Sequence, residues 1–174
     1  MGDIKKKRKL FSRPKKLFDR NRIDQENILV EKYGLKNKKE IWKAKSLVSK
    51  FRRRAKQLIK SPKDEQIIFF NKLNKIGMKV TNISDILALT EENLLDRRLQ
   101  TFVHKDKFAN SPKHARQLIV HKRVLVNGAV VNSPSFLITK DLEDKIALKE
   151  KNARVKKVEL NKQKKGEASE NGKE

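Results

Sequence analysis

The apolar residues in the first half of the chain recur every three or four positions, which is the spacing of one face of a helix. This pattern predicts three consecutive helices, at 23–33, 38–60 and 61–76. Gly34 and Gly77 directly follow the first and the third of them, and glycine commonly ends a helix in a left-handed conformation. The first half of the chain is therefore expected to form a helical subdomain.

The third of these helices is expected to begin with a cap and to pack inward. Ser61 can cap it, Pro62 suits the first helical position, and Asp64 completes a capping pattern. The segment 61–92 is the least basic part of the body, so it is expected to build core rather than to contact a charged partner. The wide apolar face of the helix consists of Ile67, Ile68, Phe69, Phe70, Leu73 and Ile76.

The pattern changes near residue 90, where two further helix starts occur. Thr90, followed by two glutamates, predicts one helix start. Ser111 and Pro112 repeat the combination of cap and proline and predict a helix through about His121. The inward residues of the first of these helices are expected to be Leu95, Leu99, Phe102 and Val103.

Short β-branched runs then predict a small sheet. Asn127 and Gly128 lie between the runs 124–126 and 129–131, and this is the strongest short hairpin signal because both turn residues need positive φ. Further strands are predicted at 136–138 and 146–148. The expected fold class is α+β, with a basic arm at 1–22, a helical subdomain at 23–92, a module of two helices and an antiparallel sheet at 93–148, and a disordered charged tail at 149–174.

The chain carries far more positive than negative charge. Its 174 residues include 45 Lys and Arg against 21 Asp and Glu, which gives a formal net charge of +24, and only 36% are hydrophobic. A compact body with this charge repels itself unless a polyanion supplies the countercharge. Nucleic acid fits better than an anionic membrane, because membrane-surface proteins usually concentrate their charge in one helix or cluster, whereas here it runs from Lys5 to Lys173.

The sequence shows no targeting or redox signals. No apolar run approaches the roughly 20 residues that span a bilayer, and the charged N-terminus lacks the apolar segment of a signal peptide. The absence of cysteine excludes disulfides, thiolate metal sites and cysteine nucleophiles. We therefore expect an intracellular, cytoplasmic protein without a membrane partner.

No credible set of catalytic or metal-binding residues emerges. His114 and His121 are seven positions apart on one predicted helix, which is too far to ligate one metal without further ligands. Zincin motifs, glycine-rich phosphate loops and nucleophile elbows do not occur. The chain is expected to have no enzymatic activity, no cofactor, no metal and no small-molecule substrate. For His121, a structural hydrogen bond at a helix end and a contact with RNA both stay open.

The candidate binding residues of the first half are cations in the arm and on the second helix. Residues 1–22 hold ten basic residues and two acids, so they are expected to form an extended arm that a partner orders. A solubilising tail or a localisation signal is the alternative. The candidate RNA contacts here are Lys6, Lys7, Arg8, Arg13, Lys43, Lys50, Arg52, Arg53 and Arg54.

The second half adds cations on the helix predicted to start at Thr90, in the first turns of the next predicted helix, and beside the hairpin. These are Arg97 and Arg98, which are expected to point outward, then Lys113 and Arg116, and finally Lys122 and Arg123. Arginine can pair two phosphate oxygens, whereas lysine acts as a point charge. Because aromatics make up only 6% of residues, the expected partner is a folded RNA recognised by shape and phosphate position.

Several motifs resemble those of a known family. In the second half these are LDRRL at 95–99, SPKHARQLI at 111–119, His121, VNG at 126–128 and NSPSF at 132–136, which resemble the RNA-binding module of the ribosomal protein S-four family. Upstream, RIDQE at 22–26 and EKYGLKNKKEIW at 31–42 resemble its archaeal and eukaryotic branch, called S-nine in older eukaryotic naming. The resemblance covers roughly 8–148, and the upstream match makes it specific, since the module alone also occurs in synthetases, pseudouridine synthases and stress proteins.

The resemblance implies a structural constituent of the small ribosomal subunit and a primary binder of 16S-type ribosomal RNA, which nucleates assembly at a multi-helix junction of the 5′ domain. It also implies a place near the mRNA entry path and ribosomal protein S-five, where the family influences translational accuracy. In the module, it implies RNA contacts at Arg97, Arg98, Lys113, His114, Arg116, Gln117, His121, Lys122 and Arg123, with Asn127 and Gly128 shaping the hairpin beside them.

Two departures from the family pattern matter. Many members read His-Gly-His after the second module helix, whereas this chain has His121, Lys122 and Arg123, which is expected to change the local turn and to add charge. Bacterial members often carry an N-terminal zinc knuckle built on cysteine, and this chain has no cysteine. Zinc is therefore not carried over, and the basic arm is expected to hold that region through RNA contacts.

Three other functions stay open at this point. The nearest is a ribosome-assembly factor of the small-subunit processome with the same module. An RNA-modifying enzyme would need a catalytic domain for which the chain lacks room and residues. A chromatin or DNA-binding basic protein would prefer duplex DNA over folded RNA.

Overall fold

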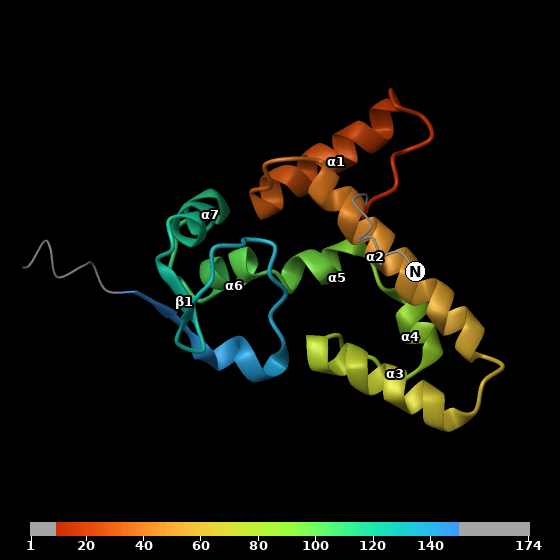
Figure 1. Ribbon diagram of the computed structural model, residues 1–174. Coiled ribbons are helices and arrows are strands. Elements are labelled where there is room, and N and C mark those ends of the chain that lie inside the picture. The colour runs from red at the N-terminus through yellow and green to blue at the C-terminus, as the bar shows by residue number, and fades with distance from the viewer. Residues whose placement is uncertain (1–9, 150–174) are drawn as a thin grey trace, which may run out of the picture.

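The computed structural model describes residues 10–149, and the path of the chain can be followed in Figure 1. The first half is helical and contains α1 (Arg20–Tyr33), α2 (Lys39–Leu58), α3 (Lys63–Ile76), α4 (Ile83–Ala88) and α5 (Glu91–Asp96). The second half contains α6 (Leu99–Lys105), α7 (Pro112–Val120), β1 (Val124–Val126), β2 (Ala129–Val130), the 3-10 helix η1 (Lys140–Lys145) and β3 (Ile146–Leu148). The predicted α+β class, with two helices followed by a small antiparallel sheet, is confirmed.

The first two predicted helices form close to the predicted positions. The spacing of Ile41, Ala44, Val48 and Leu58 places them on one buried stripe of α2, and the opposite faces carry the charge. α1 ends at Gly34, which has a φ of 57° and whose N–H reaches the carbonyls of the last turn. α1 begins at Arg20 and α2 ends at Leu58, so the predicted bounds are off by two or three residues.

Two expectations for α3 are wrong. Ser61 does not cap the helix, because α3 begins only at Lys63, which leaves Pro62 in the N-cap position with no side-chain cap. The N–H of Ser61 instead bonds to the carbonyl of Leu58 (3.1 Å) and closes the turn after α2. The apolar face is also not wholly inward. Leu73 is buried, whereas Ile67 and Ile68 are 52% and 69% exposed. The short helix packs only part of its wide apolar surface against the rest of the body.

The helix α4 is absent from the sequence-based expectations. Asn82 precedes it, and Asp85 reaches back to accept hydrogen bonds from the backbone N–H groups of Thr81 and Asn82 (2.9 Å each). These bonds lower the pKa of Asp85. The signal was present in the sequence as a capping-box spacing of Asn82 and Asp85. Ile86 then anchors the helix in the core.

The predicted helix after Thr90 is two helices. Thr90 begins α5 as expected, and its N–H donates to Asn93 Oδ1 (3.2 Å). The α-helix ends at Asp96, the N–H groups of Arg97 and Arg98 bond three residues back to Leu94 and Leu95 (3.2 and 3.3 Å), and α6 starts at Leu99. This break turns both arginines toward other parts of the chain, so the expectation that they point outward is wrong.

The sheet is antiparallel with β1 in its centre, in the order β2-β1-β3. Val126 pairs with Ala129 across the hairpin, and Asn127 and Gly128 have φ values of 51° and 78°. Positive φ at both positions confirms the predicted Asn-Gly turn. The strand predicted at 146–148 is confirmed as β3.

The strand predicted at 136–138 does not form. This segment makes a single antiparallel bridge, between Leu137 and Arg98. The N–H of Ile138 donates to the carbonyl of Arg97 (2.9 Å), and the N–H of Leu99 donates to the carbonyl of Phe136 (2.8 Å). These backbone groups therefore pair with the break between α5 and α6 instead of with the sheet.

Two hydrophobic clusters support the fold, and Figure 1 shows α5 between the two halves. The first cluster packs α1 to α5 around residues such as Ile41, Leu73 and Leu95. The second packs α6 and α7 on the sheet, around Leu99 and Ile119. No helix within residues 10–149 is long and apolar enough to cross a bilayer. The boundaries proposed for arm, helical subdomain, module and tail stay predictions.

Gly34 is the point where the end of α1 meets the start of α7. A Cβ there would lie 2.9 Å from Pro112 Cβ and 3.0 Å from the backbone N of Lys113. Gly34→Ala is expected to lower the free energy of unfolding by roughly 2–4 kcal/mol, through a strained left-handed alanine and crowding. The matched control is Gly128→Ala, which also has positive φ but no atom within 4 Å, and it is expected to cost only about 1–2 kcal/mol. Equal losses in urea unfolding would contradict the close contact at Gly34.

Candidate nucleic-acid interface

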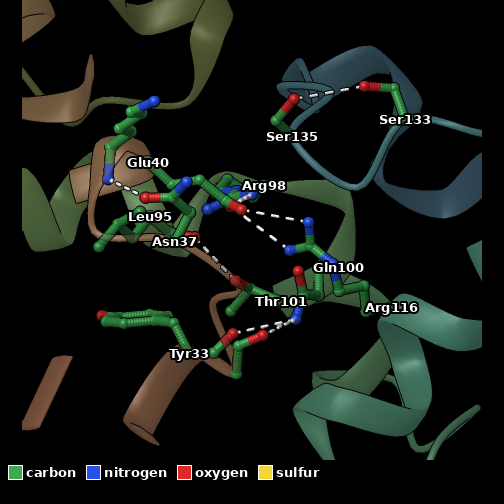
Figure 2. Close-up of polar contacts among 12 residues, drawn as sticks. Tyr33, Asn37, Glu40, Leu95, Arg98, Gln100, Thr101, Arg116, Ser133 and Ser135 are labelled. Carbon is green, nitrogen blue, oxygen red and sulfur yellow. Dashed lines mark hydrogen bonds and ion pairs between the residues drawn. The ribbon is translucent and has the colours of Figure 1, made fainter. Parts of the chain in front are cut away.

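Three charged side chains join the two halves of the molecule (Figure 2). Glu40, at the start of α2, accepts a hydrogen bond from Arg98, and its Oε1 lies 3.1 Å from Arg116 Nη2 on α7. The Arg98 side chain is only 6% exposed. We call Glu40, Arg98 and Arg116 the Glu40 cluster. Because it links α2 to both helices of the second half, it fixes the position of one half relative to the other.

The Glu40 carboxyl group has a perturbed pKa. Burial acts to raise this pKa, but the hydrogen bonds and positive charges of Arg98 and Arg116 outweigh burial and lower the pKa below its ordinary value of 4.5. The charged form of Glu40 is therefore the form that the folded state favours.

The stability of the fold is expected to depend on the charge of Glu40. Since its pKa is lower in the folded than in the unfolded state, the contribution is present above about pH 4.5 and is lost as the pH falls through the lowered pKa. Glu40→Gln removes this titration. Wild type is thus expected to exceed Glu40→Gln in free energy of unfolding at pH 7, with the difference shrinking at pH 3. A difference that does not depend on pH would contradict the ion pairs.

A buried amide supports the same junction. Gln100 Nε2 on α6 lies 3.0, 3.1 and 2.9 Å from the carbonyl oxygens of Tyr33, Gly34 and Pro112 (Figure 2). It therefore ties the end of α1 to the start of α7. The Tyr33 hydroxyl donates to Asp96 (3.1 Å), and burial followed by the nearby Asp96 charge raises the pKa of this tyrosine. Sequence reasoning did not single out Gln100.

Arg97 is engaged inside the molecule. Its Nη2 donates to the carbonyl of Ile138 (2.8 Å) and lies 2.5 Å from Glu143 Oε1. Its guanidinium also sits 4.8 Å from the ring centre of Phe102. A Cβ on Gly77 would fall 2.3 Å from Arg97 Cζ, so the absence of a side chain there makes room for the arginine. Arg97 thereby connects the end of α3 with the segment between β2 and β3.

The structure divides the predicted contact residues into two groups. Arg98 is buried, and Arg52, Arg97 and Arg116 are half-buried, with Arg52 donating to the carbonyl of Leu89 (2.6 Å). These arginines position elements of the fold. Lys6, Lys7 and Arg8 lie outside the described residues. The exposed predicted residues are Arg13, Lys43, Lys50, Arg53, Arg54, Lys113, His114, Gln117, His121, Lys122, Arg123 and Asn127.

A basic groove runs along the exposed side of α2. It encloses about 590 Å³ and is lined by Arg13, Arg22, Lys45, Lys50 and Arg53, together with Ser12, Pro14, Glu26, Trp42, Ser46 and Ser49. Its one carboxylate is committed to the protein, since Glu26 Oε1 accepts hydrogen bonds from Arg22 (2.8 Å) and Trp42 (3.0 Å). Lys45 is paired with Glu91 (3.4 Å), so Arg13, Lys50 and Arg53 are the groove cations without an ion pair within residues 10–149, and these are available to an anionic ligand.

The arm forms one wall of the basic groove. The rings of Phe11 and Trp42 lie 6.0 Å apart, and Lys39 Nζ sits 6.0 Å from the centre of the Phe11 ring. Sequence reasoning missed Arg22, Lys45 and Trp42 as groove residues. The pairing of Phe11 with Trp42 spans 31 positions and leaves no periodic signal in the sequence.

A second hollow lies over the Glu40 cluster. It has a volume of about 400 Å³, and its lining joins Lys43 of α2 to Arg116 of α7. The other lining residues are Leu10, Glu40, Ala44, Leu47, Leu94, Leu95, Arg98, Pro134, Ser135 and Leu137. Cations from both halves thus face one depression.

The exposed residues at the two ends of α7 lie on well-defined backbone. Ser111 Oγ accepts a hydrogen bond from the N–H of His114 (3.2 Å), which confirms the predicted cap. Lys122 has a φ of 58°, in the left-handed region that favours glycine, so the chain still makes a left-handed turn where the family pattern has glycine. Within residues 10–149 the imidazole of His121 has no hydrogen-bond partner, so the structural alternative for His121 gains no support.

The described part of the chain contains no candidate metal-binding site. No group of three or more His, Asp or Glu side chains there is placed to hold a metal ion. His104 instead lies with its Nδ1 3.1 Å from the carbonyl oxygen of Ala109. What the surface offers is arginine, lysine and histidine on rigid helices.

The comparison with known proteins agrees with this geometry. Residues 97–144, which run from the break before α6 to η1, match the S4 (S-four) domain family, so the second half defines an S4-domain protein. The chain is 44% identical over 151 residues to the small ribosomal subunit protein uS4 of Korarchaeum cryptofilum, a match that covers 84% of the chain and 91% of that relative. It is 43% identical over 153 residues to the small ribosomal subunit protein uS4 of Saccharolobus islandicus, covering 84% of each.

The chain belongs to the uS4 family. This confirms the resemblance that the motifs indicate, including its archaeal type. The family is one of structural ribosomal proteins and not of enzymes.

Proposed function

We propose that this chain is a structural constituent of the small ribosomal subunit and binds small-subunit ribosomal RNA directly. The observation that carries the proposal is that the cations fall into two groups, one that supports the fold and one that is exposed on the surface. Buried or half-buried arginines such as Arg97 and Arg98 fix the fold, while exposed cations such as Lys50 and Arg53 line a groove in which, among the described residues, the one carboxylate, Glu26, is paired with Arg22. A surface of this kind fits the phosphates of a folded RNA.

Recognition combines electrostatic docking with shape. Exposed cations of the basic groove and of α7 neutralise phosphates, which provides affinity without sequence information. The Glu40 cluster and Gln100 hold α7 at a fixed angle to α2, and this spacing sets the register on the RNA. A duplex DNA of different groove geometry would satisfy the charges but not the spacing.

The finer roles follow from the family resemblance. The chain would bind 16S-type RNA early and nucleate assembly of the 5′ domain. It would lie beside ribosomal protein S-five and the mRNA entry path, where it would contribute to translational accuracy. A cytoplasmic location follows from a place in the ribosome. The names of the relatives, which are small ribosomal subunit proteins, support this proposal.

The test is sucrose-gradient fractionation of a cell lysate, followed by probing small subunits washed at high salt for this chain. Stoichiometric retention in mature subunits is expected. Signal only in precursor fractions would overturn the proposal in favour of a small-subunit assembly factor. Signal away from ribosomal fractions altogether would contradict both functions.

A further inference from the structure

Phe18 is the most exposed large apolar side chain of the described residues. It is 93% exposed at the end of the arm, just before α1, and Leu17 beside it is 60% exposed. By contrast, the Phe11 ring lies 6.0 Å from the Trp42 ring, and Leu10, although 52% exposed, lines the hollow over the Glu40 cluster. The arm therefore packs Phe11 against α2 and presents Leu17 and Phe18 to the surroundings.

The backbone beneath Phe18 is anchored. Arg22 Nη2 donates to the carbonyl oxygens of Lys16 (3.4 Å) and Leu17 (2.9 Å), the residue immediately before Phe18. Arg22 is in turn held by Glu26, which is almost fully buried and also bound by Trp42. The ring is thus presented from a supported turn.

The surroundings of Phe18 are strongly cationic. Exposed Lys15, Lys16 and Arg20 flank it, and none of them forms an ion pair within residues 10–149. Asp19 is the single acid between Arg13 and Arg22. A neighbouring protein that covered an exposed phenylalanine here would need a matching acidic surface. An RNA supplies both the countercharge and flat apolar faces, namely its bases.

We propose that Phe18 stacks on an unpaired base of the bound ribosomal RNA while Lys15, Lys16 and Arg20 hold the adjoining phosphates. The base must be unpaired, because bases inside a stem stack on each other and are out of reach of a side chain. This inference rests on the proposed function. It adds one contact with a base to a surface whose other proposed contacts are with phosphates. It is compatible with the low aromatic content of the chain, since one ring is enough.

The test compares Phe18→Ala, Phe18→Leu and Phe18→Tyr in the full chain, using a transcript of small-subunit ribosomal RNA. Phe18→Ala is expected to weaken binding by about 5- to 150-fold. Phe18→Tyr, which keeps a flat ring, is expected to stay within about twofold of wild type, and Phe18→Leu to resemble alanine. The dependence of affinity on salt is expected to stay unchanged because no charge is removed. Thermal stability is also expected to stay unchanged, because the ring contributes little to the core.

The outcomes separate the inference from the proposed function. If Phe18→Ala binds the transcript as tightly as the wild-type chain does, the stacking proposal is wrong but the proposed function stands. Wild-type affinity in Phe18→Leu but not in Phe18→Ala also overturns the stacking proposal, because a generic apolar contact then suffices, as with a protein partner. Failure of wild type itself to bind the transcript overturns the proposed function. A photo-crosslinker at position 18 that labels an unpaired nucleotide supports the stacking, and labelling confined to paired stems contradicts it.

Discussion

Glu40→Ala is expected to lower the free energy of unfolding by about 3–5 kcal/mol, because it leaves a buried guanidinium without its countercharge. Arg98 is only 6% exposed, and Glu40 is its one ion-pair partner within residues 10–149. Arg116 loses the same partner but is half-buried, so water compensates part of its loss. Urea unfolding at neutral pH measures the effect directly.

The matched control is Glu92→Ala, which removes a carboxylate from an exposed ion pair with Lys32. Both partners of that pair are about half exposed, so the substitution is expected to leave the unfolding midpoint essentially unchanged. Similar losses in Glu40→Ala and Glu92→Ala would show that the Glu40 cluster is not what joins the two halves.

The second large effect concerns the basic groove. Replacing Arg13, Lys50 and Arg53 together by alanine is expected to weaken binding to small-subunit ribosomal RNA roughly 100- to 500-fold at about 0.1 M salt. The variant neutralises three fewer phosphates, so fewer counterions are released when it binds. For the same reason, log affinity is expected to fall less steeply with log salt, by about 2–3 units of slope. All three side chains are exposed, so the fold is expected to be retained.

Cations of α3 provide the control for this variant. Lys63, Lys72 and Lys75 are also exposed, and replacing them by alanine removes the same net charge. These residues lie outside the basic groove, and salt screens charges beyond about 10 Å, so affinity is expected to change by less than about fivefold. Equal losses in the two triple variants would mean that net charge, and not the groove, determines binding.

The sequence allowed local features to be predicted well. The three-and-four spacing in α2, the glycines after α1 and α3, and the Asn127-Gly128 turn each depend on neighbouring residues, and each appears in the structure. The Ser111 cap belongs to the same class, because its hydrogen bond spans three positions.

Features that depend on distant residues were not predictable in this way. Arg98 looks like a surface cation in sequence, and only the approach of Glu40, 58 positions earlier, explains its burial. The pattern around Leu95 and Leu99 continues through the break between α5 and α6, so periodicity alone gives one helix. The exposure of Ile67 follows from how little of α3 the body covers, which no local pattern records.

The candidate RNA-binding residues show the same difference between local features, which were predictable, and long-range features, which were not. Charge clustering identified α2 and the ends of α7 as the cationic surfaces, and their exposed residues are the ones now proposed to contact RNA. It could not identify Gln100, since an isolated glutamine carries no signal until the ends of α1 and α7 meet around it. Arg97 and Arg98, which lie in the family-like motif at 95–99, are among the arginines that the fold itself uses.

The central claim is that this chain docks on a folded ribosomal RNA through a fixed arrangement of exposed cations. The most direct test is the affinity of the full chain for a small-subunit ribosomal RNA transcript across a salt series, with duplex DNA as competitor. With about 6–10 phosphates neutralised, affinity is expected to fall by ~10³–10⁵ between low and moderately high salt, and the RNA is expected to outcompete the DNA. Binding that ignores salt, or that prefers the DNA duplex, would contradict the account.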